Sequence, residues 1–413
     1  MAGTAREVLR LRLESQWIAR VPSSAAAARP GAAGITAVAA HLLATQAQDF
    51  AQGVWALGVR SPGATRDDVT AALDSAQVVR SWPMRGTLHF CTPDDLRWML
   101  ALTAERTVRS AAARHRDLHL DDDTFARAAD IAAGELRGGG ALSREEFLAA
   151  LTAGGVDPAG QRGMHIIWRL AHDGLLCWGP TSGTQQALVL LDEWAPARRE
   201  PSRDEALGEF VLRYFGGHGP ATLDDFCWWS KSTVADAKRG FERVRDRLDE
   251  LVIDGTSYWM RADDGWTEET ADATGTAGIA SEAGTTSEVG STGTHRGRGA
   301  GASPIRGGVH ALPGFDEYLL GYRERSHALP AEHADRIVPG GNGIFLPMLV
   351  SKGRIVGTWR RSVSTKAVTL TPEFFEAPTA AELRGVERAF ARYGQFLGLP
   401  VKATPTTATG EAP

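Results

Sequence analysis

The stretch Leu142-Ser143-Arg144-Glu145-Glu146-Phe147-Leu148 decides the fold, because it begins the clearest copy of a unit that occurs three times along the chain. Ser143 precedes Glu146 by three residues, the spacing of a helix capping box. A second helix is predicted over residues 161–173, and two short strands follow within residues 175–191. This order of two helices and a hairpin predicts a winged helix-turn-helix unit.

A similar unit lies downstream. Apolar pairs over residues 206–215 predict one helix, and Thr222 with Asp225 three residues later predicts the start of the next. The turn Asp254-Gly255 joins two strands within residues 251–260, which is a strong hairpin signal.

The upstream copy has the same order of elements. Thr65 is placed to cap a helix over residues 66–73. A hairpin is predicted from residues 78–80 and 86–90, and Thr92 begins the next helix.

The C-terminal part is predicted to be rich in strands. Segments 309–312, 344–350 and 355–359, with a tight turn at Lys352-Gly353, fit a small β-barrel. A last helix begins with a capping box at Thr379. Its inward residues are predicted to be Leu383, Val386, Phe390 and Tyr393.

We therefore predict an α+β fold in which tandem winged helix-turn-helix units are followed by a small C-terminal β-barrel. A composition rich in glycine, threonine, alanine and serine predicts a flexible insert before the barrel. The predicted divisions are a first winged-helix unit with the catalytic motif over residues 1–135, a second over 136–198, a third over 199–263, the insert over 264–303, the barrel and closing helix over 304–400, and a disordered tail over 401–413.

Composition limits the class of protein. The chain has 413 residues, of which 43% are hydrophobic and 23% charged, as in ordinary globular proteins of more than one packed unit. Its net charge of −5 argues against a protein that only binds nucleic acid tightly and unselectively, because phosphate neutralisation dominates such binding. A DNA contact must then come from local patches. One candidate is the arginine-rich set Arg80, Arg85, Arg97, Arg106, Arg109, Arg114 and Arg116, which would otherwise be a solvated face.

Cysteine usage and the lack of long apolar runs predict a cytoplasmic protein that does not enter a membrane. Cys91, Cys177 and Cys227 lie far apart, and no close cysteine or histidine spacing indicates zinc. Residues 1–20 lack the apolar region of a secretory signal, and no later run is long enough to span a bilayer. We expect no metal and no cofactor, and a monomer.

The most informative motif for function is Ala44-Thr45-Gln46-Ala47-Gln48-Asp49. It follows a helical stripe in which apolar residues recur at three- and four-residue spacing from Ile35 to Leu43, and Gln46 is next on that stripe. Successive helical residues are about 100° apart, so Gln46 and Gln48 would diverge by roughly 200° in a regular helix. If both amides act in one site, the helix must break near Thr45. The structural alternative is that Gln46 is a satisfied buried amide and Gln48 an exposed helix residue.

The segment from His41 to Asp49, followed by Val54-Trp55-Ala56-Leu57-Gly58-Val59-Arg60, resembles the glutamine-apolar-glutamine motif of the AlkZ-type winged-helix DNA glycosylases. Two further blocks resemble the same family: Trp82-Pro83-Met84-Arg85-Gly86-Thr87-Leu88-His89 and the segment 312–326, which begins Leu312-Pro313-Gly314-Phe315-Asp316-Glu317-Tyr318. The resemblance implies that Gln46 and Gln48 are catalytic and that the partner is double-stranded DNA with alkylated bases.

The chemistry of two amides is narrow. Glutamine accepts a hydrogen bond from water and directs a carbonyl dipole at developing positive charge, but it does not remove a proton near neutral pH. An N-alkylated purine already carries positive charge, so its glycosidic bond can break without enzymic protonation. We therefore expect a monofunctional DNA glycosylase that excises cationic N-alkylated purines by water attack at the anomeric carbon. Bulky adducts and interstrand crosslinks are further candidate lesions.

Neighbouring residues have competing interpretations. Asp49 is either a base or, as we favour, a helix cap. Trp82, Arg85 and His89 are candidate contacts near the reaction centre, although a lone histidine or tryptophan is more often structural. No lysine lies near the motif to form a Schiff base, with a distant lysine such as Lys352 the open alternative.

The hairpin tip with Lys352 and Arg354 is a candidate DNA contact, although most basic tips are solvated. The mixed charges within residues 315–325 indicate a partly buried ion-pair network before a DNA contact.

The competing function is a non-catalytic winged-helix DNA-binding protein, such as a transcriptional regulator. The repeated units favour it, while the acidic balance and the lack of an evident dimer zipper weaken it. A small-molecule hydrolase has no support, because no serine elbow or cysteine–histidine pairing is visible.

Overall fold

The computed structural model is a mixed α+β molecule, which confirms the α+β part of the prediction. It describes residues 4–21, 30–182, 185–196, 199–262, 308–403 and 407–408. The predicted flexible insert, residues 264–303, lies outside these ranges. Among the described residues, no helix is both long enough and apolar enough to cross a membrane.

The first unit follows helix α1 (Ala5–Ser15). Its elements are α2 (Ala32–Leu42), β1 (Thr45–Gln46), α3 (Phe50–Gly58), α4 (Arg66–Asp74), β2 (Val79–Met84) and β3 (Thr87–Cys91). Helix α4 begins at the predicted cap Thr65, which forms a capping box, because the Thr65 and Asp68 side chains each bond the other residue's backbone N–H. Strand β1 pairs antiparallel with β3, so the residues after α2 belong to a sheet.

The second unit repeats this order. Helices α5 (Pro93–Ser110) and α6 (Ala112–Asp117) precede it, and its elements are α7 (Asp122–Leu136), α8 (Arg144–Ala153), α9 (Arg162–His172), β4 (Leu176–Ser182), β5 (Gln185–Leu190) and α10 (Leu191–Trp194). Because α7 packs with α8 and α9, this unit begins before the predicted boundary at residue 136. The Ser143–Glu146 capping box at the start of α8 is confirmed. Leu142 pairs with Leu188 of β5, as β1 pairs with β3 in the first unit. The two hairpins form one five-stranded sheet of order β1-β3-β2-β4-β5.

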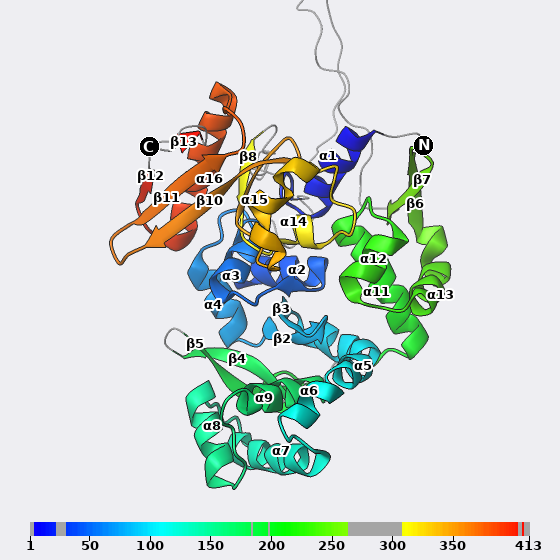
Figure 1. Ribbon diagram of the computed structural model, residues 1–413, viewed down its shortest axis with the longest axis vertical. Helices are drawn as coiled ribbons and strands as arrows, with labels where there is room; N and C mark the ends of the chain where they lie inside the picture. Colours follow the sequence, from blue (N-terminus) through cyan, green and yellow to red (C-terminus); the bar gives the residue numbers. More distant parts are fainter. Residues whose placement is uncertain are drawn as a thin grey trace, which may run out of the picture.

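The third unit has its own hairpin. Its elements are α11 (Arg203–His218), α12 (Leu223–Ser230), α13 (Val234–Val244), β6 (Leu248–Ile253) and β7 (Thr256–Arg261). Thr222 and Asp225 form the predicted capping box of α12, and Ala221 pairs with Trp259 of β7. The hairpin turn is the predicted Asp254-Gly255, both at positive φ. In Figure 1 this unit lies to one side of the first, while α7 and α8 of the second form the far end of the molecule.

The C-terminal part is a curled sheet that covers the first unit. Its elements are β8 (Val309–Leu312), α14 (Glu317–Leu320), α15 (Ala334–Ile337), β9 (Met348–Ser351), β10 (Arg354–Val363), β11 (Val368–Phe374), α16 (Ala380–Leu397), β12 (Val401–Ala403) and β13 (Thr407–Ala408). The pairings run in the order β12-β11-β10-β9-β8, with β13 also on β11. The sheet is therefore curled into a half-barrel, where the sequence predicted a small β-barrel.

Three details of the C-terminal prediction are wrong. Residues 344–347 lie outside β9, and Ile344 is 53% exposed, because the strand begins only at Met348. Residues 401–403 and 407–408 belong to the sheet and not to a disordered tail, since they pair in parallel with β11. Leu383 is 36% exposed, whereas the other three predicted inward residues of α16 are buried.

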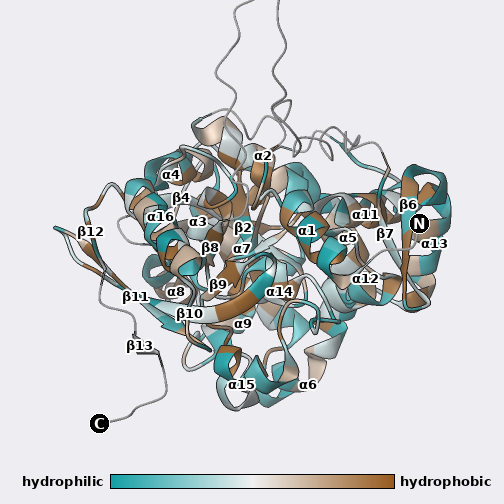
Figure 2. Cartoon of the chain, turned by 90° about the horizontal axis from the view of Figure 1, so that it is seen from above, coloured by the Kyte–Doolittle hydropathy of each residue, from teal (hydrophilic) through white to brown (hydrophobic). Residues whose placement is uncertain are grey.

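One hydrophobic core joins the first unit to the C-terminal sheet. The Trp55 indole N–H donates to the Ala311 carbonyl at 2.8 Å, and its ring lies 4.9 Å from that of Tyr393. Figure 2 shows hydrophobic residues on β9, towards the middle of the molecule, and more hydrophilic ones on the outer helix α15. Helix α3 is consequently fixed on the sheet, and the glutamine segment immediately precedes it.

Helix α1 joins segments that are distant in sequence. Arg12 and Ser15 donate to the carbonyls of Pro220 and Gly219, and the Gln16 amide donates to the Tyr322 hydroxyl at 2.9 Å. Arg60, also fully buried, donates to both oxygens of Asp316 at 2.7 and 2.9 Å. The Arg60–Asp316 pair is a buried ion pair that includes a residue of the segment 315–325, where the sequence predicted a partly buried ion-pair network.

Candidate active site

The helix that leads to the glutamines ends before them, as a shared site requires. Helix α2 ends at Leu42, and Leu43 has a φ of +64° that no helix continues. Thr45 and Gln46 then form β1, and Ala47 donates its N–H to the Leu88 carbonyl at 2.8 Å. Side chains alternate along a strand, so Thr45 projects to the side opposite Gln46. Gln48 lies beyond β1, in a bend before α3. Thr45 and Ala47 are buried, while Gln46 is half-buried and Gln48 exposed.

Asp49 is the cap of helix α3, as the sequence indicated. Its carboxylate accepts from the Gln52 N–H at 3.2 Å, and its backbone is extended. This contact gives Asp49 a structural role that requires no proton transfer.

The β2–β3 hairpin lies beside the glutamines and brings Arg85 to them. Gln46 faces His89 in the β1–β3 register. Arg85 and Gly86 form the two-residue turn, with φ of +58° and +67°. This backbone conformation is strained for arginine, and such strain is often found at functional sites. The Arg85 side chain is 9% exposed, and its guanidinium lies 3.5 Å from Gln46 Oε1 and 2.8 Å from His89 Nε2.

His89 is a neutral acceptor in this arrangement. Burial, and then the charge of Arg85, lower the pKa of His89 to about 3. Nδ1 lies 2.8 Å from the Thr87 carbonyl, which can only accept, so Nδ1 carries the proton. Nε2 is left to accept from Arg85. His89 therefore orients the guanidinium without adding charge.

Gln48 is held by the same hairpin. Its Oε1 accepts from the Leu88 N–H at 3.2 Å. Arg80 donates to the backbone carbonyls of Ala47 and Gln48 at 2.9 and 3.3 Å. Arg80 was predicted only as one member of a basic patch, but it fixes the backbone of the glutamine segment. The hairpin consequently contacts both amides.

Three residues at the site were not identified as site residues from the sequence. Glu317, in the block that resembles the family, accepts from the Gln46 backbone N–H at 3.2 Å. The indole N–H of Trp229 donates to the same carboxylate at 2.7 Å, and His218 Nε2 lies 3.5 Å from it. The sequence signal was present only for Glu317, because Trp229 and His218 belong to helices whose patterns indicate core packing.

Other predicted site residues lie elsewhere. Trp82 is 4% exposed and belongs to the hydrophobic core of the second unit, which favours its structural interpretation. Lys352 and Arg354 are exposed beside a turn that is itself packed. A Cβ on Gly353 would lie 2.5 Å from Leu9, and the Tyr318 hydroxyl donates to the Gly353 carbonyl. The turn thus lies against α1 and against the residue after Glu317.

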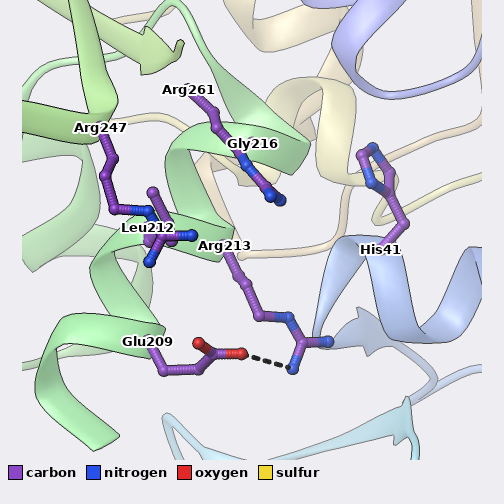
Figure 3. A pocket seen from close by; sticks show the side chains of 7 residues that line it. All are labelled: His41, Glu209, Leu212, Arg213, Gly216, Arg247 and Arg261. Atoms are coloured by element: carbon purple, nitrogen blue, oxygen red, sulfur yellow. Dashed lines mark ion pairs between the residues drawn. The ribbon is translucent and has the colours of Figure 1, made fainter. Parts of the chain in front are cut away.

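A separate depression of about 200 Å³ lies between α2 and the third unit (Figure 3). It is lined by His41, Glu209, Leu212, Arg213, Gly216, Arg247 and Arg261, so neither glutamine belongs to it. Arg213 is already paired with both oxygens of Asp95 and with Glu209. Much of the positive charge of this depression is therefore neutralised within the chain.

In the part of the chain that the structure describes, no three histidine, cysteine or carboxylate side chains are grouped so as to hold a metal ion. The groups at the glutamine site are amides, an arginine, a neutral histidine and a carboxylate. Together they offer hydrogen bonds and fixed charges.

The fold matches that of a DNA repair enzyme. The solved structure of Streptomyces sahachiroi DNA glycosylase AlkZ superposes with a TM-score of 0.72 at 24% identity, covering 98% of this chain and 100% of that one. An interstrand DNA cross-link repair glycosylase of Streptomyces sahachiroi is 24% identical over 425 residues, which cover 97% of this chain and 100% of that protein. The sequence profile of the AlkZ-like DNA glycosylases matches residues 39–396.

These findings define a DNA glycosylase, an enzyme that hydrolyses N-glycosidic bonds. The chain belongs to the AlkZ-like DNA glycosylase family. Both the resemblance and the enzyme class predicted from the sequence are confirmed.

Proposed function

We propose that this glycosylase is monofunctional and excises cationic N-alkylated purines from double-stranded DNA by water attack at the anomeric carbon. The observation that supports the proposal is that the β2–β3 hairpin contacts both amide oxygens: the Arg85 guanidinium lies 3.5 Å from Gln46 Oε1, and the Leu88 N–H donates to Gln48 Oε1 at 3.2 Å. Amides cannot act as general bases near neutral pH, so the substrate must be one whose base is ready to leave. A cationic alkylpurine meets this requirement.

In the proposed mechanism the two carboxamides position water and stabilise charge. Each carbonyl oxygen has two lone pairs, and donors on the hairpin use one of them in Gln46 and in Gln48. The second lone pair of each oxygen accepts from the attacking water. The carbonyl dipoles also stabilise the oxocarbenium-like sugar as the base departs as a neutral molecule, and the proton of the attacking water passes to bulk solvent after the new C–O bond forms.

The repeated units and the exposed basic turn support a proposal for how this chain contacts DNA. The three units share the order of helix, short extended residue, two helices and hairpin, and we assign them as winged-helix units that contact DNA. Lys352 and Arg354 are exposed and remain proposed DNA contacts. We propose a cytoplasmic monomer. Because the relative from Streptomyces sahachiroi is named for interstrand cross-link repair, bulky adducts and crosslinks are the next lesions to test.

Base release from a duplex that contains one 7-methylguanine tests the proposal. Gln46→Ala and Gln48→Ala are each expected to slow single-turnover release by about 100-fold, the usual effect of losing one preorganised hydrogen-bonding group. Asp49→Asn is the matched control, because asparagine keeps the helix cap and removes only the carboxylate. It is expected to leave the rate little changed.

Full activity in both glutamine variants would contradict the assigned roles. Loss of activity in Asp49→Asn alone would assign the reaction to a general base. Binding of undamaged and alkylated duplexes without any base release, measured by fluorescence anisotropy, would instead favour a non-catalytic DNA-binding protein.

A further inference from the structure

A buried carboxylate lies directly behind the glutamine strand. Glu317 is fully buried, and Oε1 accepts from the Gln46 backbone N–H at 3.2 Å. The same oxygen lies 3.9 Å from the Arg85 guanidinium. Oε2 accepts from Trp229 Nε1 at 2.7 Å and lies 3.5 Å from His218 Nε2. One side chain thus contacts the glutamine backbone and the arginine that bonds the glutamine amide.

This carboxylate is charged under physiological conditions. Burial alone raises the pKa of a carboxyl group, but the His218 contact and the charge of Arg85 outweigh burial and lower the pKa of Glu317 to about 2. A charge with no access to solvent is tolerated only when it is paired and hydrogen-bonded, as Glu317 is. Its field at the site is only weakly screened by water.

The preceding residue offers a natural comparison. Asp316 is equally buried and also ionically paired, but its partner is Arg60, to which both carboxylate oxygens bond. Asp316 also caps α14 through the Tyr318 N–H. Two adjacent buried carboxylates therefore both have structural roles, but Glu317 contacts Gln46 and Arg85, whereas Asp316 bonds to Arg60 and to the Tyr318 N–H.

We propose that Glu317 is a positioning residue of the excision reaction, which fixes Gln46 and Arg85 and offsets the arginine charge so that the site favours a cationic sugar. This inference rests on the function proposed above. Arg85 lies within hydrogen-bond reach of the Gln46 carbonyl, and its positive charge would oppose an oxocarbenium-like transition state. The buried negative charge of Glu317 offsets the positive charge of Arg85, so Arg85 no longer disfavours the cationic transition state.

The test compares binding to two product-like duplexes. One carries a protonated pyrrolidine abasic nucleotide, which mimics the cationic sugar, and the other carries a neutral tetrahydrofuran abasic nucleotide. The ratio of the two dissociation constants is measured for the wild type and for Glu317→Gln, which has the same size and no charge. The preference of the wild type for the cationic duplex is expected to fall by about tenfold in the variant, equivalent to about 1.4 kcal/mol.

A purely structural role would leave this ratio unchanged, because partial unfolding weakens both complexes equally. Asp316→Asn is the matched control, since asparagine keeps the cap and removes a neighbouring buried charge. Asp316→Asn is expected to lower the free energy of unfolding and to keep the preference for the cationic duplex. If Glu317→Gln does not fold, Glu317→Asp carries the test, because it withdraws the charge from Gln46 and should give an intermediate ratio.

A wild-type ratio in every folded Glu317 variant would overturn the inference. Its failure differs from a failure of the proposed function. In the first case the wild type releases 7-methylguanine but Glu317→Gln keeps the cation preference, whereas in the second the wild type releases no base.

Discussion

The two sides of the glutamine segment differ in burial, and Thr45 lies on the buried side. Its side chain is on the side opposite Gln46, is 1% exposed, and its hydroxyl has no hydrogen-bond partner within the described chain. An unsatisfied buried hydroxyl is destabilising, and valine has nearly the same shape. Thr45→Val is therefore expected to raise the free energy of unfolding by about 1 kcal/mol, measured by urea denaturation.

The same variant checks the alternation of side chains along β1. Base release is expected to be unchanged, because Thr45 faces the core and not the site. Slower release at higher stability would show that Thr45 and Gln46 do not lie on opposite sides.

At the scale of residues, the sequence predicted what depends on near neighbours. The cap at Asp49 and the capping boxes at Thr65, Ser143 and Thr222 follow from spacings of three residues, and all of them formed. Glu317 could not be assigned to Gln46 in this way, because 271 residues separate them. The neutral state of His89 also depends on burial, which a single sequence does not reveal.

At the scale of elements, the distance between α3 and β1 is set by a glycine. A Cβ on Gly53 would lie 2.9 Å from the Phe90 ring and 3.0 Å from Ala47, which stands between the two glutamines. Gly53→Ala is therefore expected to displace the glutamine segment and slow base release by roughly tenfold or more. Overpacking is also expected to lower stability by about 1–3 kcal/mol.

The control for this substitution is Gly134→Ala in α7, where an added Cβ meets nothing within 4 Å. It is expected to keep the rate of base release and to stabilise the protein by up to about 1 kcal/mol, because alanine favours helix. Equal rates in Gly53→Ala and Gly134→Ala would show that the position of β1 does not control the reaction.

Prediction of elements succeeded where periodicity and caps agreed. The stripe before the glutamines is buried as expected, and the hairpin turns at Asp254-Gly255 and Lys352-Gly353 formed at positive φ. The barrel did not close, because closure depends on whether β8 and β12 meet across the sheet, and strand patterns carry no such information. The prediction that Leu383 is buried is wrong, because this residue lies in the exposed first turn of α16.

At the scale of the whole molecule, buried histidines make stability depend on pH. Burial lowers the pKa of His89 to about 3 and those of His172 and His310 to about 4, against an ordinary value of 6.5. Between pH 6.5 and 4 the unfolded chain binds these protons and the folded chain does not. Stability is therefore present above pH 6.5 and is lost as the pH falls.

Urea denaturation at pH 7.5 and 5.5 is expected to show a loss of about 1 kcal/mol for each of these histidines. His172→Asn, which can still donate to the Trp168 carbonyl, should show a smaller loss between the two pH values. Glu317 contributes in the same direction at lower pH, because its lowered pKa means that its stabilisation is lost only as the pH falls below about 4.5. Constant stability from pH 7.5 to 5.5 would show that the histidines titrate normally in the folded protein.

Helix α1 has a consequence for the order in which the chain assembles during synthesis. The carbonyls that accept hydrogen bonds from Arg12 and Ser15 are more than 200 residues away in sequence. The Tyr322 hydroxyl, which accepts from the Gln16 amide, is 306 residues from it. A helix of 11 residues is marginal in water without its partners. Helix α1 can therefore dock only after the chain has been synthesised as far as Tyr322.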